Sequence, residues 1–560
     1  MENEKIINQT PRKERFKFAQ HEEVIHDTKF ETKSVSYLQD CLRRFAKNKA
    51  SVVASFIILF IALFAIIGPI VNPRTYIEDS FNVEEYEEDI VKFAHVTPRN
   101  EWFVDAGFWD GKETAEISIN EYELKRYSDS NYKKFDEDTI EEFIPEEYRE
   151  LQELNPNFNV DAYKMYRVER DNYAIGCYDK TLTYADYQAL VQYEIDHGIH
   201  KDITKSIIKP VVDYAPYLEE LKAELTAKGI NAESIINNMR TSYSTDKNIF
   251  FKLYPVTRTG STELSDTTFV PRLDDNGNIC PLYKTDADNN LVWALDAGGE
   301  MKVRVDFYDY FTYKYGFTPN YLLGADSKGE DILLSLALGA RFSLLLGVGI
   351  TVINFLIGLI WGSISGYYGG TVDLTMERLT DIIANIPTII IMSIAQIQFT
   401  HNDSLRATLG PAGIIIAAIL VAFVYNGWVG VAATTRMQFY RFKGQEYVLA
   451  SRTLGAKDSR LIFKHILPNS AGTLVTRSVL LIPGIIFSES SLSYLGIIDF
   501  EGSGIYSVGN MLSKGQSFIN TYPHELLFPC LLISLLMISF NLFGNGLRDA
   551  FNTSLRGSED

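Results

Sequence analysis

A basic segment, residues 446–469, holds the side chains of this sequence that are best suited to ionic contacts. Seven Lys and Arg lie between Arg436 and Asn469, against two acids, Glu446 and Asp458. Apolar runs flank the segment on both sides, but the segment itself is too charged to lie in lipid. Because basic loops stay on the inner side of a membrane, we expect these residues in the cytoplasm. Their cations could there pair with acids on a partner.

The local sequence predicts two short helices in this segment. A first helical turn begins at Glu446, where an acid is favoured by the helix dipole. Gly455 breaks this helix, and Asp458 or Ser459 is available to cap the helix that follows. Pro468 predicts a sharp return toward the membrane, since the residue before a proline disfavours helical geometry. On periodicity alone, an ordinary amphipathic cytoplasmic loop is the commoner structure for such a pattern.

Glu489 is a second candidate for chemistry, within the run FSESSLSYLG of a predicted span. A carboxylate inside a membrane is unfavourable unless it faces water or a partner. Glu489 is therefore a candidate for a polar pathway through the membrane or for an interhelical pair, and the second role is at least as common. Four amides in or near the spans are candidates for the same two roles: Asn385, Gln396, Asn426 and Asn541.

Six apolar runs of membrane-spanning length organise the chain: residues 50–71, 340–366, 381–399, 412–433, 472–488 and 525–544. Six spans and a basic N-terminal region predict that both termini lie in the cytoplasm. The chain accordingly divides into an N-terminal segment (1–49), a first span (50–71), an insert (72–318) and a core (319–560). The core holds the other five spans, and its part 446–464 is the predicted cytoplasmic helix.

Turn and cap residues predict how the spans of the core are joined. Asp326 and Asp331 are suited to capping a helix that starts at about Ser335. An inner turn is expected at 369–380 and an outer loop at 400–411. Pro387 is expected to kink the third span.

The insert carries the acidity of the chain. Residues 72–320 hold 27 Lys and Arg against 48 Asp and Glu, a net charge of −21, while the whole chain has −19. An acidic domain argues against nucleic-acid binding, which needs a basic face, and it suits the outer side of a membrane. Turn signals and amphipathic patterns predict an α+β domain with helices at 139–154, 184–197 and 217–228 and strands at 250–256 and 302–308. We expect a cap without chemistry of its own rather than an enzymatic domain.

The N-terminal segment predicts attachment to a membrane. Residues 37–49 have an amphipathic pattern that places Arg43, Arg44, Lys47 and Lys49 at the lipid headgroups of the inner surface. No cleavage site of small residues follows the first span, so we expect this span to remain as an anchor.

Cysteine and histidine spacing shows no metal-ligand pattern, so we expect no metal site. Among the four Cys, Cys177 and Cys280 share the insert. A disulfide between them and two free thiols are about equally compatible with the sequence.

The basic segment resembles the EAA loop of ABC importer permeases, in the form found in oligopeptide, dipeptide and nickel permeases. Glu446, Ala450, Gly455 and the closing HILPN of residues 465–469 carry the similarity. In that family the loop forms a short coupling helix that docks in a groove on a separate ATPase subunit, and small residues allow the close approach. By this resemblance, the ATPase-coupling residues here are Glu446, Ala450, Arg452, Gly455, Ala456, Lys457, Arg460, His465 and Pro468.

Three further motifs resemble the same family and follow its order. Residues 323–331 (LGADSKGED) are similar to L-G-T-D-x-x-G-R-D, with Glu330 where an Arg is usual. Residues 489–496 and 541–549 are similar to E-x-x-L-S-x-L-G and N-L-x-G-D-G-L-R-D, with Asn545 in place of the acid of the second motif. The resemblance covers roughly half of the chain and leaves the insert unexplained.

The resemblance implies an α-helical polytopic membrane protein of six spans with the type I ABC importer permease fold and an inserted extracytoplasmic α+β domain. It implies a permease subunit in the cell membrane that imports oligopeptides or dipeptides. Its partners would be a second, different permease, two ATP-binding subunits and an extracytoplasmic substrate-binding protein. ATP and Mg would be bound by those ATPase subunits. The sequence has no G-x-x-x-x-G-K-[ST] motif, and we expect it to bind no cofactor and to be no enzyme.

Two other functions stay open at the level of the residues. A membrane receptor that senses a ligand through the insert would need a cytoplasmic signalling module. An ion-coupled secondary transporter would show several charges or broken helices at the midplane of the membrane, where Glu489 is nearly alone. Co-purification of an ATPase, and its loss on Gly455→Asp, would favour the permease.

Overall fold

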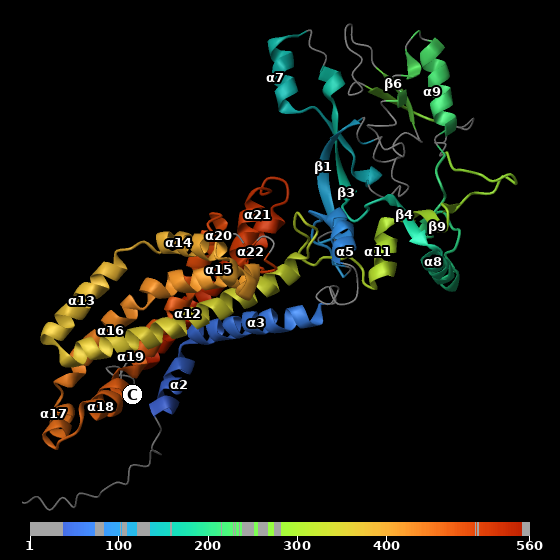
Figure 1. Cartoon of the computed structure of the whole chain (residues 1–560). Coiled ribbons are helices and arrows are strands. Elements are labelled where there is room, and N and C mark those ends of the chain that lie inside the picture. The colour runs from blue at the N-terminus through green and yellow to red at the C-terminus, as the bar shows by residue number, and fades with distance from the viewer. Residues whose placement is uncertain are drawn as a thin grey trace, which may run out of the picture.

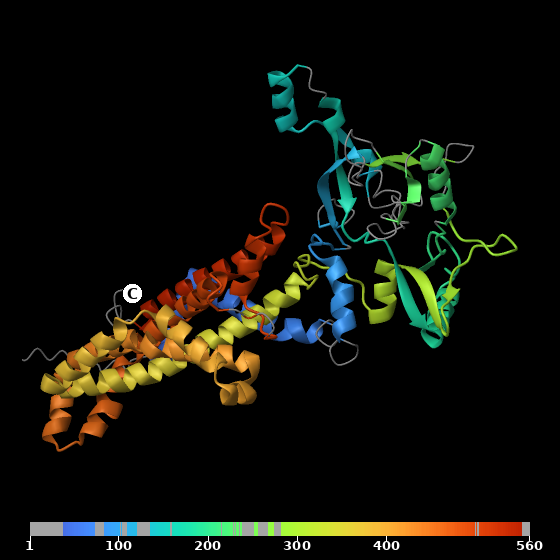
Figure 2. The same ribbon diagram turned by 45° about the horizontal axis from the view of Figure 1, so that its top comes forward.

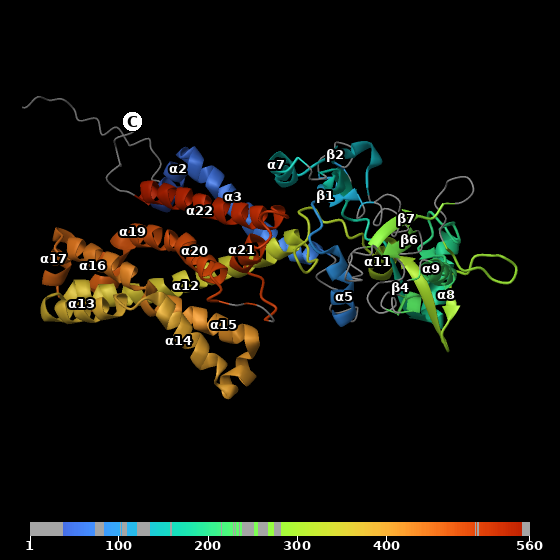
Figure 3. The same ribbon diagram turned by 90° about the horizontal axis from the view of Figure 1, so that it is seen from above.

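The computed structural model shows a bundle of long helices with a folded insert at one end (Figure 1). The short helices α17 (Glu446–Thr453) and α18 (Asp458–Arg460) lie at the opposite end of the bundle, as Figures 1 and 3 both show. The structure describes residues 37–72, 83–100, 102–103, 109–119, 122, 135–156, 160–213, 215–227, 229, 231–233, 236–237, 251–255, 267–273, 282–498, 500 and 503–551.

Apolar helices build the bundle. They are α3 (Lys49–Val71), α12 (Ile332–Tyr368), α13 (Gly370–Ala384), α14 (Thr388–Thr400), α15 (Asp403–Gly427), α16 (Val429–Lys443), α19 (Leu467–Val479), α20 (Leu481–Tyr494) and α22 (His524–Phe551). A large apolar core lies around Ile350 of α12 and Ala418 and Ile419 of α15. Within the described residues, five helical stretches are long and apolar enough to cross a membrane, and the predicted six are reached if the bent pair α13–α14 is one span.

The start of α12 differs from the prediction. The helix begins at Ile332, before the expected Ser335, because the carboxylate of Asp331 caps it by accepting the N–H of Leu333 at 3.0 Å. Asp326 does not cap this helix. Its carboxylate instead accepts the N–H groups of Lys328 and Glu330, both at 2.9 Å, and so closes the turn before the helix.

The structure also corrects two predicted loops. The expected inner turn at 369–380 is largely helical, because the chain turns at Gly369 (φ +68°) and α13 starts at the next residue. The expected outer loop at 400–411 is mostly helical too, since Asn402 caps α15 by accepting the N–H of Leu405 at 3.1 Å. The kink at Pro387 is confirmed: α13 and α14 meet at 70°, as expected where a proline excludes a helical residue before it.

The N-terminal helix α2 (Tyr37–Lys47) is slightly shorter than the predicted 37–49. Asn48 ends it and caps α3, where its side chain accepts the N–H of Ser51 at 3.3 Å. The ring of Phe45 packs on Phe543 of α22 with 5.5 Å between ring centres. α2 is therefore fastened to the end of α22.

Three antiparallel sheets form the β part of the insert. The first sheet has the strand order β1 (Lys112–Ser118), β3 (Met165–Asp171), β2 (Glu141–Phe143). The second has the order β4 (Cys177–Thr183), β9 (Glu300–Asp306), β5 (Ile208–Lys209), and β8 (Leu295–Asp296) also pairs with β9. The third pairs β6 (Phe251–Pro255) with β7 (Thr267–Pro271). The helices are α5 (Val83–Ile90), α7 (Glu146–Leu154), α8 (Tyr184–Asp196), α9 (Ala215–Ala227) and α11 (Phe307–Tyr315).

The predicted elements of the insert are confirmed except for one. The helices expected at 184–197 and 217–228 are α8 and α9, and the strands expected at 250–256 and 302–308 are β6 and β9. The helix expected at 139–154 is wrong in its first half, where β2 and Pro145 precede α7, because a proline restricts the residue before it to extended geometry. Cys280 lies outside the described residues, so the pairing of Cys177 stays open.

The base of the insert packs directly on the bundle. Backbone hydrogen bonds join His95 N to Asp326 O at 3.0 Å and Ala325 N to Val96 O at 3.0 Å. The imidazole of His95 contacts the carboxylate of Glu525, in the first turn of α22, at 2.5 Å. Figure 2 shows the insert extending outward from the end of the bundle where α12 begins. The base of the insert therefore has a fixed position against the bundle.

Candidate functional site in the basic segment and the bundle interior

The basic segment forms a helix–turn–helix. Gly455 has φ +82°, a left-handed conformation that L-residues rarely adopt, and it follows the end of α17. α18 and the π-helical turn Leu461–Ile466 then lead into α19 without a break. The break predicted at Gly455 is confirmed, and the two short helices predicted for the segment 446–464 are α17 and α18.

The sharp return predicted at Pro468 is wrong. Pro468 lies within the continuous helical run from α18 to α19, directly after the π-helical turn Leu461–Ile466, so the chain does not turn back there. The change of direction falls between the end of α17 and the start of α18 instead.

Apolar side chains hold the basic segment against the bundle. Val448, Leu461 and Ile466 are buried together with Tyr367 of α12 and Phe439 of α16. Burying a side chain of this size contributes about 1.5–3 kcal/mol relative to leaving it in water. The segment is therefore a fixed part of the fold.

Polar contacts supplement this packing. The hydroxyl of Tyr367 donates to Oδ1 of Asp458 at 2.5 Å and accepts from the guanidinium of Arg452 at 3.3 Å. At the other end of the segment, the amide of Asn469 donates to the hydroxyl of Tyr447 at 3.2 Å. These contacts orient α17 and α18 relative to the end of α12.

Most of the predicted coupling residues lie at the surface of the segment. Exposed are Glu446, Ala450, Arg452, Gly455, Lys457, Arg460 and Pro468, whereas Ala456 and His465 are half-buried. Sequence reasoning missed two apolar residues beside them, Leu454 and Phe463, which are 88% and 67% exposed. Exposed apolar side chains next to cations are typical of a binding surface. A leucine directly before the helix-ending Gly455 was the signal that could have revealed the first of them.

Glu489 lies fully buried where α20 meets α12 and α21 (Val508–Gln516). Its carboxylate accepts hydrogen bonds from the hydroxyls of Ser507 at 2.6 Å, Ser343 at 3.2 Å and Ser490 at 3.3 Å. In the described part of the chain, no Lys, Arg or His forms an ion pair with it. The geometry is that of an interhelical hydrogen-bond centre.

The four candidate amides do not share one site. Asn426 lies at the bend between α13 and α14, where its side chain donates to Oγ1 of Thr388 at 3.1 Å. Asn385 and Asn541 are exposed and donate to carbonyls of their own helices, those of Asp381 and Met537. Gln396 is half-buried within α14. Only Asn426 among them joins two helices.

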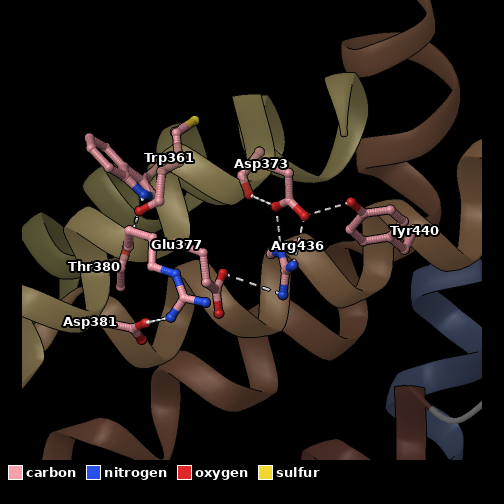
Figure 4. Close-up of polar contacts among 10 residues, drawn as sticks. Trp361, Asp373, Glu377, Thr380, Asp381, Arg436 and Tyr440 are labelled. Carbon is pink, nitrogen blue, oxygen red and sulfur yellow. Dashed lines mark hydrogen bonds and ion pairs between the residues drawn. The ribbon is translucent and has the colours of Figure 1, made fainter. Parts of the chain in front are cut away.

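A cluster that sequence reasoning did not predict lies where α12, α13 and α16 meet (Figure 4). The carboxylate of Asp373 accepts Nε–H and Nη2–H of Arg436 at 2.6 and 2.7 Å and the hydroxyl of Tyr440 at 2.7 Å. Ser365 of α12 donates to the same carboxylate. Glu377, one turn further along α13, pairs with Arg436 at 3.3 Å. Three helices thus converge on one buried acid.

Fold and site together define a class of protein: a polytopic helical membrane protein with a basic helix–turn–helix fixed at one end of its bundle, away from a folded insert. Residues 358–557 match the family of binding-protein-dependent transport system inner membrane components. Residues 36–87 match the N-terminal TM domain of oligopeptide transport permease C. The chain belongs to this family of ABC transporter permeases.

Curated relatives agree with this assignment. The oligopeptide transport system permease protein OppC of Bacillus subtilis is 40% identical over 237 residues, which are 42% of this chain and 73% of that protein. The dipeptide transport system permease protein DppC of Bacillus subtilis is 37% identical over 42% of this chain and 70% of its own length. OppC of Escherichia coli K12 is 34% identical over 41% of this chain and 72% of its own length.

Among solved structures, a chain of the inward-facing MetNI methionine ABC transporter aligns with 39% of this chain and 98% of its own length. The sequence identity is 18% and the TM-score is 0.29, too low to define how the helices are arranged here.

Proposed function

We propose that this chain is one of two different permease subunits of an ATP-driven importer for oligopeptides or dipeptides. The names of its curated relatives support this substrate class. The partners are a second permease, two ATP-binding subunits that hold ATP and Mg, and an extracytoplasmic substrate-binding protein. Family membership favours this function over a membrane receptor and over an ion-coupled carrier.

The observation that carries the proposal is the exposed apolar surface of the basic segment. Leu454 and Phe463 offer anchors for an apolar groove on the ATPase, as a docking helix requires. Lys457 and Arg460, exposed beside them, pair with acids at the rim of that groove. Because Val448 and Tyr367 fix the segment to the bundle, a movement of the groove displaces the helices behind it.

The proposed topology places the basic segment and both termini in the cytoplasm and the insert outside the plasma membrane. The position of the basic segment and the insert at opposite ends of the bundle supports it (Figures 1 and 3), as does the bias of Lys and Arg. The insert then forms a cap over a type I importer permease fold. Exposed aromatic side chains on it, such as Trp102 (88%) and Tyr184 (58%), offer contacts for the binding protein.

Co-purification of the ATPase subunits with the tagged chain tests the proposal. We expect Leu454→Asp to lower the recovered ATPase at least about tenfold, the effect of losing a buried interface anchor. The matched control is Leu154→Asp, since Leu154 is 82% exposed on α7 of the insert and should leave recovery unchanged. Absence of any ATPase with the unaltered chain, or equal recovery with both variants, would refute the proposal.

A further inference from the structure

The Arg436–Asp373 pair links α13 to the helix that carries the basic segment. Its two parallel hydrogen bonds fix the orientation of the two helices as well as their distance, which a single contact would not do. Asp373 is buried, whereas the Arg436 side chain is 29% exposed. A buried carboxylate that loses its cation is strongly unfavourable, so α13 is expected to follow α16 when α16 moves.

α16 is joined to the basic segment almost directly. Lys443, its last residue, donates to the carbonyl of Gly366 at 2.9 Å, and α17 starts at Glu446. At Gly362 of α12, a Cβ would come within 2.3 Å of the carbonyl oxygen of Ala432, so α12 and α16 pack backbone to backbone. A displacement of the basic segment is therefore passed to α12 and α16 as one unit.

Further contacts hold the bent pair α13–α14 beyond the ion pair. Asn426 of α15 donates to Thr388 in the first turn of α14, beside the 70° bend. Nε1 of Trp361 in α12 donates to Oγ1 of Thr380 in α13 at 3.1 Å (Figure 4). The helices α12, α15 and α16 thus contact the bent pair both along α13 and at its bend.

We propose that Asp373 and Arg436 are positioning residues that make α13 and α14 follow the basic segment when the ATPase subunits move it. The inference rests on the proposed function, because it needs an ATPase that drives the segment. Without the ion pair the segment still docks and ATP is still hydrolysed, but the bent pair follows it less completely, because only the contacts of Thr380 and Thr388 remain. More ATP is then hydrolysed for each peptide transported.

The test uses the complete complex with all partner subunits in proteoliposomes. For Asp373→Asn and for Arg436→Gln, we expect uptake of radiolabelled trialanine per ATP hydrolysed to fall between about two- and thirtyfold, the range for residues that modulate coupling. ATPase recovery on co-purification stays unchanged. Arg436→Lys keeps the positive charge but loses the paired hydrogen bonds of the guanidinium, so we expect it to retain part of the uptake. The matched control is Arg378→Gln, which removes an exposed pair within α13, Arg378–Asp381 at 3.2 Å, and leaves the ratio unchanged.

A doubly neutral variant, Asp373→Asn with Arg436→Gln, separates coupling from stability. Because neither partner is charged, a purely structural role predicts that uptake per ATP returns to the unaltered value. The positioning role predicts that it stays low. Recovery in the double variant, or an equal loss of ATPase binding and uptake in the single variants, overturns the inference. If the unaltered chain recovers no ATPase, the proposed function fails and the inference fails with it.

Discussion

The hydroxyl of Tyr367, at the end of α12, donates a hydrogen bond of 2.5 Å to the carboxylate of Asp458 in α18. The Tyr367 ring is buried among Phe439, Val448 and Leu461, so its hydroxyl has a fixed position. The same oxygen accepts a hydrogen bond from Arg452 of α17. One phenol therefore orients both short helices of the basic segment.

Tyr367→Phe should loosen the basic segment without removing its packing. The ring stays, while the loss of the hydrogen bond costs about 1 kcal/mol. We expect faster amide hydrogen exchange in residues 446–466. The matched control is Tyr368→Phe, since that neighbouring side chain is 57% exposed and its change should leave exchange unaltered. An equal increase in both variants would show that the hydroxyl of Tyr367 does not orient the segment.

Gly455→Ala should weaken ATPase binding through backbone strain alone. Gly455 has φ +82°, and a Cβ there would meet open space, so a substitution meets no steric clash. An L-residue in this conformation is unfavourable by about 1 kcal/mol or more. We expect the turn between α17 and α18 to distort and so relieve this strain. Gly444→Ala is the control, because Gly444 also faces open space but has φ −90°. Co-purified ATPase should fall only for Gly455→Ala; equal recovery would contradict the role of the turn.

The parts of this site that local chemistry determines could be predicted from the sequence. The break at Gly455 and the kink at Pro387 follow from the backbone of glycine and proline, and both are found. Pro468 shows the limit of such rules. A proline often follows the end of a helix, but here a π-helical turn precedes it and the helix runs on from α18 into α19, with Leu461 and Ile466 buried against the bundle.

The parts that tertiary contact determines could not be predicted. Asp373 and Arg436 are 63 residues apart, and each by itself resembles an ordinary charge at the end of a span. Val448 of α17 is buried and Leu454, directly after that helix, is 88% exposed, although both are apolar in the sequence. The family motif N-L-x-G-D-G-L-R-D likewise gains a structural reason here: a Cβ on Gly546 would lie 2.1 Å from Oγ of Ser51, so this glycine permits α3 to cross α22.

Glu489 offers a prediction that separates an interhelical role from a transport role. Glu489→Leu leaves the hydroxyls of Ser343 and Ser507 without their acceptor, which costs about 1–3 kcal/mol for each buried group. Glu489→Gln keeps one acceptor oxygen and should cost less. Thermal unfolding in detergent micelles measures both, with Ser488→Ala as the control, since the half-buried Ser488 donates to the carbonyl of Gly484 in its own helix. Loss of peptide uptake in Glu489→Gln at unchanged stability would instead assign the carboxylate to the transport pathway.

Asp89 gives the insert a dependence on pH. It is 1% exposed and accepts hydrogen bonds from Lys180 at 2.7 Å, Lys314 at 3.2 Å and the hydroxyl of Tyr315 at 3.0 Å. Burial by itself raises the pKa of Asp89, but the hydrogen bonds and charges of the two lysines together lower it below its ordinary value of 3.8. Because the folded-state pKa is the lower one, Asp89 contributes its full stability above pH 3.8 and loses it as the pH falls through the folded-state pKa.

Asp89→Asn should therefore destabilise the insert at neutral pH by about 3 kcal/mol or more, since two lysines lose a buried partner. The difference from the unaltered protein should shrink in acid. Hydrogen exchange of β4 and α11 measures it. Asp136→Asn is the control, because it breaks the more exposed pair Lys112–Asp136 at 2.8 Å and should cost less than about 1 kcal/mol. Equal effects of the two substitutions would contradict the role given to Asp89.

Glu330, which stands where the family usually has Arg, should act in the opposite direction. Burial raises the pKa of Glu330 above its ordinary value of 4.5, and the hydroxyl of Tyr506 at 3.3 Å offsets this only in part. Because the folded-state pKa is the higher one, its contribution to stability is greatest below pH 4.5 and falls as the pH rises through the folded-state pKa. Glu330→Gln should then raise the melting temperature at pH 7 by about 2 °C or more and leave it unchanged below pH 4.5. Glu88→Gln, on the exposed face of α5, should have no such effect. A lower melting temperature for Glu330→Gln at pH 7 would mean that the ionised carboxylate stabilises the junction between insert and bundle.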